Sequence, residues 1–148
     1  MKFCCIKFLF VAAFALAIAV SGSQQLHADG HSAAAMTKKV IDDHLADFGT
    51  GNIDAILANY ADDSVVIVPG KVLRGPEALR PLFEDLVAEF SHPDVTFELL
   101  NEDVADNMLM LVFRARTGKG KIELGTDTFI VRDGKIAQQT IVKKYAEQ

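Results

Sequence analysis

The segment "GTDTFIVRDGKI" (residues 125–136) decides the fold, because it predicts a strand that enters a tight turn. Successive side chains of a strand point to opposite faces, so Asp127, Phe129 and Val131 share one face. Asp133-Gly134 is a pair typical of a two-residue hairpin turn, and a second alternating run follows it. An acid therefore lies on the same face as two apolar side chains, which are expected to point into the protein.

The rest of the chain predicts helices first and strands after them. Amphipathic helices are expected from Thr37, Asn52 and Pro76, because apolar residues recur at spacings of three and four. A short strand, Ser64–Val68, lies between the second and third helices. The later expected strands are Val95–Leu100, Met108–Arg116, Ile122–Arg132 and Lys135–Tyr145. This order predicts an α+β domain, with helices packed on one face of a curved antiparallel sheet.

Counting from the Asp133-Gly134 turn predicts which residues of the last strand share the face of Asp127. With a two-residue turn, Asp127 faces Thr140 and Phe129 faces Gln138, and cross-strand neighbours share a face. These pairings predict a small polar island within an apolar wall. A slip of one residue would reverse the assignment.

Two polar side chains of the helices are expected to point toward the same region. His44 lies in the apolar stripe of the first helix, four residues before Phe48, and Tyr60 ends the stripe of the second helix. An acid, an imidazole and a phenol around one cavity would form an acid–base site. Burial disfavours a charged carboxylate, so Asp127 would donate a hydrogen bond when neutral or take a proton when ionised.

Each of these three residues also has a purely structural interpretation. Asp127 would then lie near a strand end, in water, bonded only to its neighbours on the adjacent strand. His44 would be a core histidine with satisfied hydrogen bonds. Tyr60 would pack its ring and leave its hydroxyl at the surface. Perturbed polar groups indicate functional sites only in a statistical sense, so both interpretations stay open.

Residues 1–28 are typical of a secretory signal peptide. Two lysines precede an unbroken apolar run, Phe8–Val20, of 13 residues, which is shorter than the about 20 residues of a membrane-spanning helix. Cleavage is expected after Ala28, with Ser23 as the alternative position. An uncleaved membrane anchor is the alternative for the whole segment. The predicted localisation is periplasmic or secreted, with no membrane association after cleavage.

The composition fits one exported domain, residues 37–148, behind a short flexible leader, residues 29–36. Both cysteines, Cys4 and Cys5, precede the apolar run, so a hydrophobic core must stabilise the mature chain. Cleavage leaves 13 Lys and Arg against 20 Asp and Glu, a net charge of −7. This acidity argues against nucleic acid as a partner. No metal-ligand spacing or phosphate-binding loop is present in the sequence, so no metal and no cofactor are expected.

The order of the elements and three local motifs resemble a known superfamily. The motifs are "GNIDAILANYADDSVVIVPG" (51–70), "LRGPEALRPLFEDL" (73–86) and the segment 125–136. Residues 37–145 resemble the SnoaL-like branch of the nuclear transport factor 2-like superfamily. The resemblance implies a cone-shaped, cystatin-like fold with three N-terminal helices on a curved antiparallel sheet, and a homodimer. It names no reaction, because the fold hosts isomerases, cyclases, dehydratases, hydrolases and binding proteins.

Ketosteroid isomerase, a related enzyme, uses a neutral buried carboxylic acid as an oxyanion donor. The resemblance places that acid on Asp127, the family's oxyanion tyrosine on His44 and a supporting tyrosine on Tyr60. A further tyrosine falls near Phe83. The general base falls on Val68, which cannot take a proton, so a steroid-type proton shift is not expected of this chain.

Three functional hypotheses follow. The first is an exported lyase or isomerase without a cofactor, acting on a small, largely apolar carbonyl or hydroxyl compound through Asp127, His44 and Tyr60. The second is a non-catalytic module that binds a small apolar molecule in the same cavity. The third is a homodimeric interaction protein that uses the open sheet face. The residues expected to contact a ligand are Gln138, Thr140, Phe129, Phe83, Val68 and Phe48.

Overall fold

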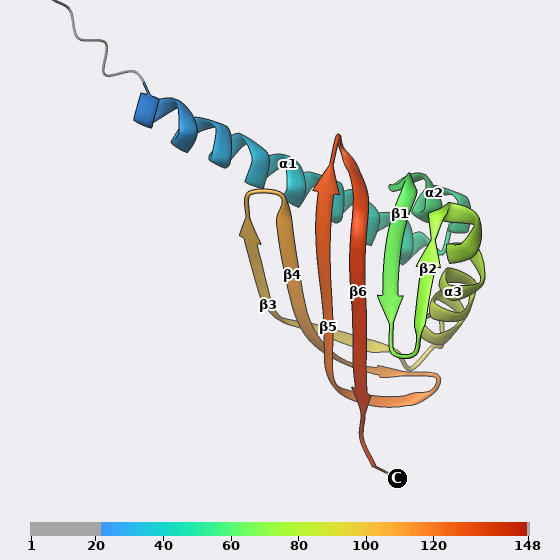
Figure 1. Ribbon diagram of the computed structural model, residues 1–148. Helices are drawn as coiled ribbons and strands as arrows, with labels where there is room; N and C mark the ends of the chain where they lie inside the picture. Colours follow the sequence, from blue (N-terminus) through green and yellow to red (C-terminus); the bar gives the residue numbers. More distant parts are fainter. Residues whose placement is uncertain (1–21, 148) are drawn as a thin grey trace, which may run out of the picture.

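The computed structural model describes residues 22–147, and residues 1–21 of the expected signal peptide lie outside this range. The elements are α1 (Gly22–Thr50), α2 (Ile53–Ala58), β1 (Tyr60–Val68), β2 (Lys71–Arg74), α3 (Gly75–Phe90), β3 (Thr96–Ala105), β4 (Met108–Thr117), β5 (Gly120–Arg132) and β6 (Lys135–Tyr145). The helices cover the concave face of one curved sheet (Figure 1). The predicted α+β class is therefore confirmed.

The sheet has the strand order β2-β1-β6-β5-β4-β3. All neighbouring strands are antiparallel except β1 and β6, which are parallel. The predicted curved antiparallel sheet is confirmed. It includes one parallel pair, because a long crossover through α3 and the meander returns the chain beside β1. Strand β2 is absent from the sequence-based prediction, because its four residues, Lys71–Arg74, are too few to show a period of two.

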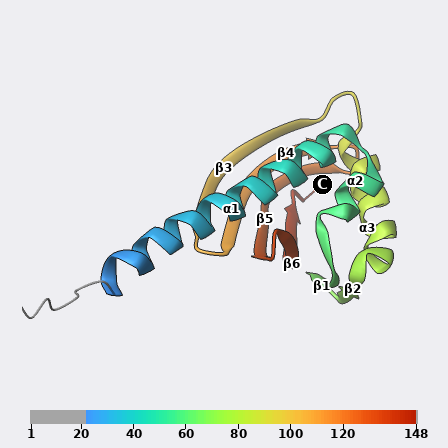
Figure 2. The same cartoon turned by 90° about the horizontal axis from the view of Figure 1, so that it is seen from above.

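Helix α1 begins at Gly22, whereas the sequence predicts a start at Thr37. The expected leader, residues 29–36, is therefore helical, in keeping with the high helix propensity of its three consecutive alanines. Thr37 lies inside the helix, and its Oγ1 donates to the carbonyl oxygen of Asp106 at 2.9 Å. The first turns of α1 project beyond the sheet (Figure 2). No helix within residues 22–147 has the length and apolar content of a membrane span.

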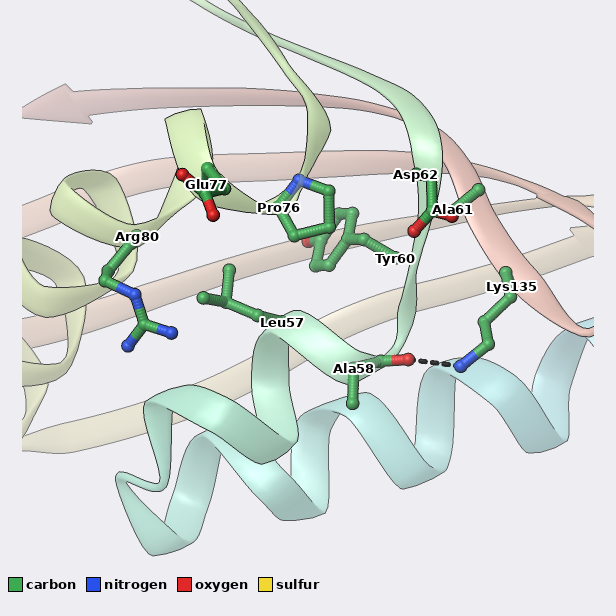
Figure 3. Close-up of a pocket in the computed structure, with 9 residues that line it drawn as sticks. All are labelled: Leu57, Ala58, Tyr60, Ala61, Asp62, Pro76, Glu77, Arg80 and Lys135. Atoms are coloured by element: carbon green, nitrogen blue, oxygen red, sulfur yellow. Dashed lines mark hydrogen bonds between the residues drawn. The ribbon is translucent and has the colours of Figure 1, made fainter.

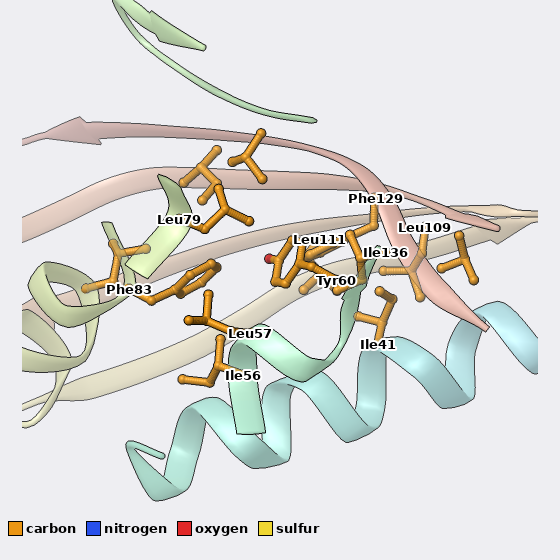
Figure 4. Packing of buried hydrophobic residues seen from close by; sticks show 14 residues of the cluster. Ile41, Ile56, Leu57, Tyr60, Leu79, Phe83, Leu109, Leu111, Phe129 and Ile136 are labelled. Atoms are coloured by element: carbon orange, nitrogen blue, oxygen red, sulfur yellow. The ribbon is translucent and has the colours of Figure 1, made fainter. Parts of the chain in front are cut away.

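The core lies between the helices and the inner face of the sheet (Figure 4). Helix α2 begins where the sequence predicts, since the Asn52 side chain accepts a hydrogen bond from the backbone N–H of Ala55 at 3.1 Å. Tyr60 is the first residue of β1 rather than the last of the helical stripe, yet it is buried as expected. The largest fully buried side chains are Phe83, Phe129, Ile41, Ile56, Leu79, Leu109, Leu111, Ile122 and Ile136.

A β-bulge in β6 changes the register two residues beyond the turn. Val131 pairs with Ile136 as predicted, but the next residue of β5, Ile130, pairs with Gln138. Ala137 is therefore an extra residue, and both it and Ile136 are buried. The backbone N–H of Ile136 donates to the carbonyl oxygen of Asn59 at 2.8 Å, which ties this point of β6 to the start of β1.

The bulge reverses the predicted faces of the following residues. Asp127 pairs with Ile141 rather than Thr140, and Phe129 pairs with Gln139 rather than Gln138. Gln138 and Thr140 are exposed on the outer face, so their predicted inward orientation is wrong. Gln139 is buried on the inner face in their place. The inward orientation of Asp127 itself does not depend on this register.

Candidate functional site

A cavity of about 350 Å³ opens between α1, α3 and the inner face of the sheet. It is lined mainly by apolar side chains, with four polar ones among them. The apolar lining residues are Leu45, Phe48, Phe83, Leu86, Phe90, Phe97, Leu111, Phe113 and Ile141. The polar ones are His44, Asp127, Gln139 and Lys143. An apolar pocket with a few convergent polar groups is typical of a small-molecule site.

Asp127 reaches the cavity from the middle of β5. Its cross-strand neighbours are Leu111 on β4 and Ile141 on β6, both apolar. Its Oδ1 atom is buried and has no hydrogen-bond partner among the described residues. Burial raises the pKa of this carboxyl group to about 7, against the opposing effect of the Lys143 charge. Both protonation states are therefore populated near neutral pH.

His44 projects from α1 and lines the same cavity as Asp127. It lies within a cage of aromatic side chains. Its ring meets those of Tyr60, Phe83 and Phe129 nearly edge-to-face, with centroids 5.4, 5.8 and 5.8 Å away. Its Nδ1 atom is buried without a partner within residues 22–147. Burial lowers the His44 pKa to about 4, although the Asp47 charge opposes this effect. The imidazole is therefore neutral at neutral pH, with one nitrogen free to accept a proton.

Tyr60 contributes to the site through another side chain. Its hydroxyl group donates a hydrogen bond to Oε1 of Gln139, and Gln139, rather than Tyr60, lines the cavity. Burial, with the Asp127 charge as a second cause, raises the Tyr60 pKa well above its ordinary value. The Tyr60 proton is thus held by Gln139, which the sequence-based register places on the wrong face.

The other predicted contact residues fall into different places. Phe48 and Phe83 line the cavity. Phe129 packs on His44 in the core behind it. Val68 lines a neighbouring recess of about 240 Å³, which shares Leu86, Ile141 and Lys143 with the cavity. The exposed positions of Gln138 and Thr140 place them away from the cavity.

A buried ionic cluster, which sequence reasoning missed, adjoins the cavity. The carboxylate of Glu89, near the end of α3, accepts hydrogen bonds from Lys143 Nζ at 2.8 Å and Thr117 Oγ1 at 3.0 Å. It also accepts one from the Tyr145 hydroxyl, and Lys119 Nζ lies 3.5 Å away. Burial raises the Glu89 pKa, but these partners outweigh burial and lower it overall. The available signal was the position of Glu89, three residues after Leu86 on the apolar stripe.

Gly125 leaves room for the Phe113 ring in the wall of the cavity. It pairs with Phe113 on β4 and with Lys143 on β6. A Cβ atom at this position would overlap the Phe113 ring. The missing side chain therefore lets the ring lie across β5, where it forms part of the cavity lining.

A wider and more open recess of about 600 Å³ lies between α2, β1 and α3 (Figure 3). Its cations are already paired, since Arg80 Nη2 lies 2.7 Å from Asp54 Oδ1 and Lys135 donates to the carbonyl oxygen of Ala58. The two unpartnered buried atoms of His44 and Asp127 belong to the smaller cavity instead. The smaller cavity is therefore the better candidate for chemistry.

Several solved structures share this fold at low sequence identity. A nuclear transport factor 2-like protein from Mesorhizobium loti has a TM-score of 0.63 and 19% identity, covering 75% of this chain and 93% of its own. An epoxide hydrolase/cyclase-like enzyme of pyran ring formation in the polyether salinomycin has a TM-score of 0.60 and 20% identity, with coverages of 73% and 90%.

A de novo designed protein with a curved β-sheet is as similar, with a TM-score of 0.62, 16% identity and coverages of 74% and 86%. These likenesses establish the architecture and leave the reaction open. The comparison with curated protein sequences found no significant match. The family model of the SnoaL-like domain matches residues 41–139, which is more than half of the chain. The match includes all the strands of the sheet except the end of β6. The chain therefore belongs to the SnoaL-like domain family.

Proposed function

We propose that this chain is an exported SnoaL-like protein that holds a small, largely apolar molecule in the cavity and transfers protons to or from it through Asp127. The observation that carries the proposal is the Asp127 carboxyl group, which faces an apolar cavity with its Oδ1 atom unpartnered among the described residues. An unsatisfied buried polar group costs stability, so its retention favours a functional role.

The chemistry that this arrangement supports is lyase- or isomerase-type proton transfer without a cofactor. Protonated Asp127 donates to a carbonyl or hydroxyl oxygen of the ligand, and ionised Asp127 removes a proton from a carbon or oxygen beside it. The neutral imidazole of His44 takes the complementary role, because its Nδ1 atom is free. Tyr60 acts as a positioning residue that fixes Gln139. The resemblance to ketosteroid isomerase places the base of that enzyme on Val68, so the proposed reaction does not rely on that group.

Titration of Asp127 by carboxyl-carbon NMR tests the proposal first. The expected midpoint is about 7, against an ordinary value of 3.8. Asp127→Asn is expected to lower turnover of any converted carbonyl or hydroxyl compound by about 100-fold or more, while ligand binding persists. Asp94→Asn, at an exposed loop position, is the matched control. A midpoint near 3.8, or full activity of Asp127→Asn, would refute the acid–base role.

A non-catalytic binding module is the second candidate. Two features favour it. The Tyr60 hydroxyl already donates its proton to Gln139 and so does not donate it to a ligand, and Val68 is apolar and cannot act as a base. In that case a ligand would be retained through purification and mass spectrometry would recover it chemically unchanged after prolonged incubation. A ligand converted by the wild-type protein and left intact by Asp127→Asn would instead establish the enzyme.

Homodimerisation through the outer face of the sheet is part of the proposal. Ile67, Val72, Met108 and Val142 are exposed, at 46, 57, 44 and 51%, and the strand registers place them on the side away from the helices. Scattered exposed apolar residues are ordinary, but a group on one open face is typical of an interface.

Light scattering at micromolar concentration is expected to give twice the chain mass. Val142→Glu should yield a monomer, because it places a charge in the centre of the contact. Val104→Glu, on the opposite face beside Leu109, should leave the dimer intact. A monomeric wild type would exclude the dimer.

Export rests on the sequence of residues 1–28. Its test is the N-terminus of the protein recovered from the periplasm or medium, which is expected to be Asp29. An intact N-terminus in the membrane fraction would indicate the alternative, an uncleaved anchor.

A further inference from the structure

Lys143 is the unexplained cation of the cavity wall. It projects from the inner face of β6, with its side chain only 16% exposed. Its Nζ atom lies 5.8 Å from the centre of the Phe90 ring and 5.6 Å from that of Tyr145. It lines both the cavity and the neighbouring recess. A long, solvated side chain would normally keep its ammonium group in water, so this enclosed position calls for an explanation.

Glu89 accounts for part of the Lys143 charge. The carboxylate is bonded to Lys143 at 2.8 Å, but it is also shared with Lys119 at 3.5 Å and with two hydroxyl groups. The Tyr145 hydroxyl keeps its proton, because burial and the bond to Glu89 raise its pKa to about 12. One carboxylate therefore contacts two ammonium groups, of which that of Lys119 is more than half exposed and screened by water. Asp85, the other acid of the recess, is exposed and its charge is screened by water.

The cavity side of Lys143 carries a surplus of positive charge while Asp127 is protonated. Of the groups that line the cavity, His44 is neutral, and Asp127 is neutral whenever it is protonated. An ammonium group has three N–H donors, and one of those of Lys143 is used by Glu89. The other two make no hydrogen bond among the described residues and are available to a partner.

We propose that the molecule bound in the cavity is an amphipathic acid, whose carboxylate pairs with Lys143 while its apolar body contacts the aromatic wall. This inference rests on the proposed small-molecule function and names its ligand class. Phe48, Phe90 and Phe97 supply apolar surface for the body of the ligand. A carboxylate at Lys143 gains a charge-assisted hydrogen bond, which is about twice as strong as a neutral one. Asp127, on the adjacent strand, then lies beside the part of the molecule that follows the carboxylate.

Paired probes of equal shape test this ligand class. 4-Phenylbutyrate and 4-phenyl-1-butanol are titrated by calorimetry against the purified chain at pH 6. The acid is expected to bind at least about tenfold more tightly than the alcohol. Lys143→Met should abolish this preference and change the affinity for the alcohol less than about threefold.

Lys144→Met is the matched control, because Lys144 is 73% exposed and pairs with Glu123 on the outside of the sheet. It should retain the preference for the acid. The double variant Lys143→Met/Glu89→Gln removes the buried charges together, so it reports on binding where Lys143→Met alone fails to fold.

The outcomes separate this inference from the proposed function. Equal affinities of acid and alcohol for the wild-type chain would refute the acidic ligand and leave the apolar cavity function standing. Retention of the acid preference by the double variant would also refute the role of Lys143. Binding of neither probe would overturn both proposals.

Discussion

Asp127→Asn is expected to change the pH dependence of stability, so that the free energy of unfolding rises by about 3 kcal/mol between pH 4 and pH 6.5. The wild-type protein is expected to be nearly insensitive to pH over this range, because two buried groups oppose each other. The variant removes one of them and leaves the other.

The folded pKa of Asp127, about 7, lies above its ordinary value of 3.8. The folded state therefore holds a proton that the unfolded state has lost, and stability falls by about 4 kcal/mol as pH rises from 3.8 to 7. The folded pKa of His44, about 4, lies below its ordinary value of 6.5. Its contribution is present above pH 6.5, and about 3 kcal/mol of it is lost as pH falls to 4.

Urea unfolding at pH 4.5, 5.5, 6.5 and 7.5 measures these slopes. His44→Phe, which fits the aromatic cage, should show the reverse of Asp127→Asn: its stability should fall as pH rises. Other titrating groups such as Glu89 affect all three proteins alike, so the differences between them isolate the two residues. Parallel pH profiles for the wild type and Asp127→Asn would show that Asp127 is solvated.

Glu89→Ala is expected to destabilise the protein by about 3–5 kcal/mol, because it leaves the enclosed ammonium group of Lys143 without its carboxylate. The Glu89 side chain is fully buried and is the common acceptor for Lys143, Thr117 and Tyr145. Its loss therefore strands several polar groups at once.

Glu98→Ala is the comparison that separates burial from pairing. Glu98 makes two hydrogen bonds with Arg114, at 2.8 and 2.9 Å, but both side chains are more than half exposed. Its removal should cost less than about 1 kcal/mol. Chemical denaturation measures both variants, and equal losses would contradict a special role for the buried cluster. The double variant Glu89→Ala/Lys143→Met should recover part of the loss.

The inward orientations of Asp127 and His44 were predictable from the sequence, because each lies in the middle of a regular element. Strict periods of two and 3.6 fix the face of such residues whatever the neighbours do. Tyr60 was predicted to be buried, although it belongs to a strand rather than a helix. Tyr60 closely follows α2 whether it is assigned to the helix or to the strand, and its side chain is buried in either case.

The polar partners of Asp127 could not be predicted by counting from a turn. The bulge at Ala137 lies beside a hydrogen bond between Ile136 and Asn59, which are far apart in the sequence. Glu89 was equally hidden, because a charged residue on a helix stripe gives no sign of its partners on two distant segments. Local pattern therefore located the acid and the imidazole, and tertiary contacts determined what surrounds them.

The extra residue Ala137 decides which face of β6 lines the cavity. If Ala137 paired regularly with Ile130 instead of bulging, the strand after it would shift by one position and turn Gln138, Thr140 and Val142 inward. Gln139, Ile141 and Lys143 would then face the solvent. Deletion of Ala137 would instead keep the present faces, because Gln138 would still pair with Ile130 directly after the Val131–Ile136 pair. The choice between a bulge and a regular pair at one residue therefore sets whether β6 presents a cation or hydroxyl-bearing, neutral side chains to a ligand.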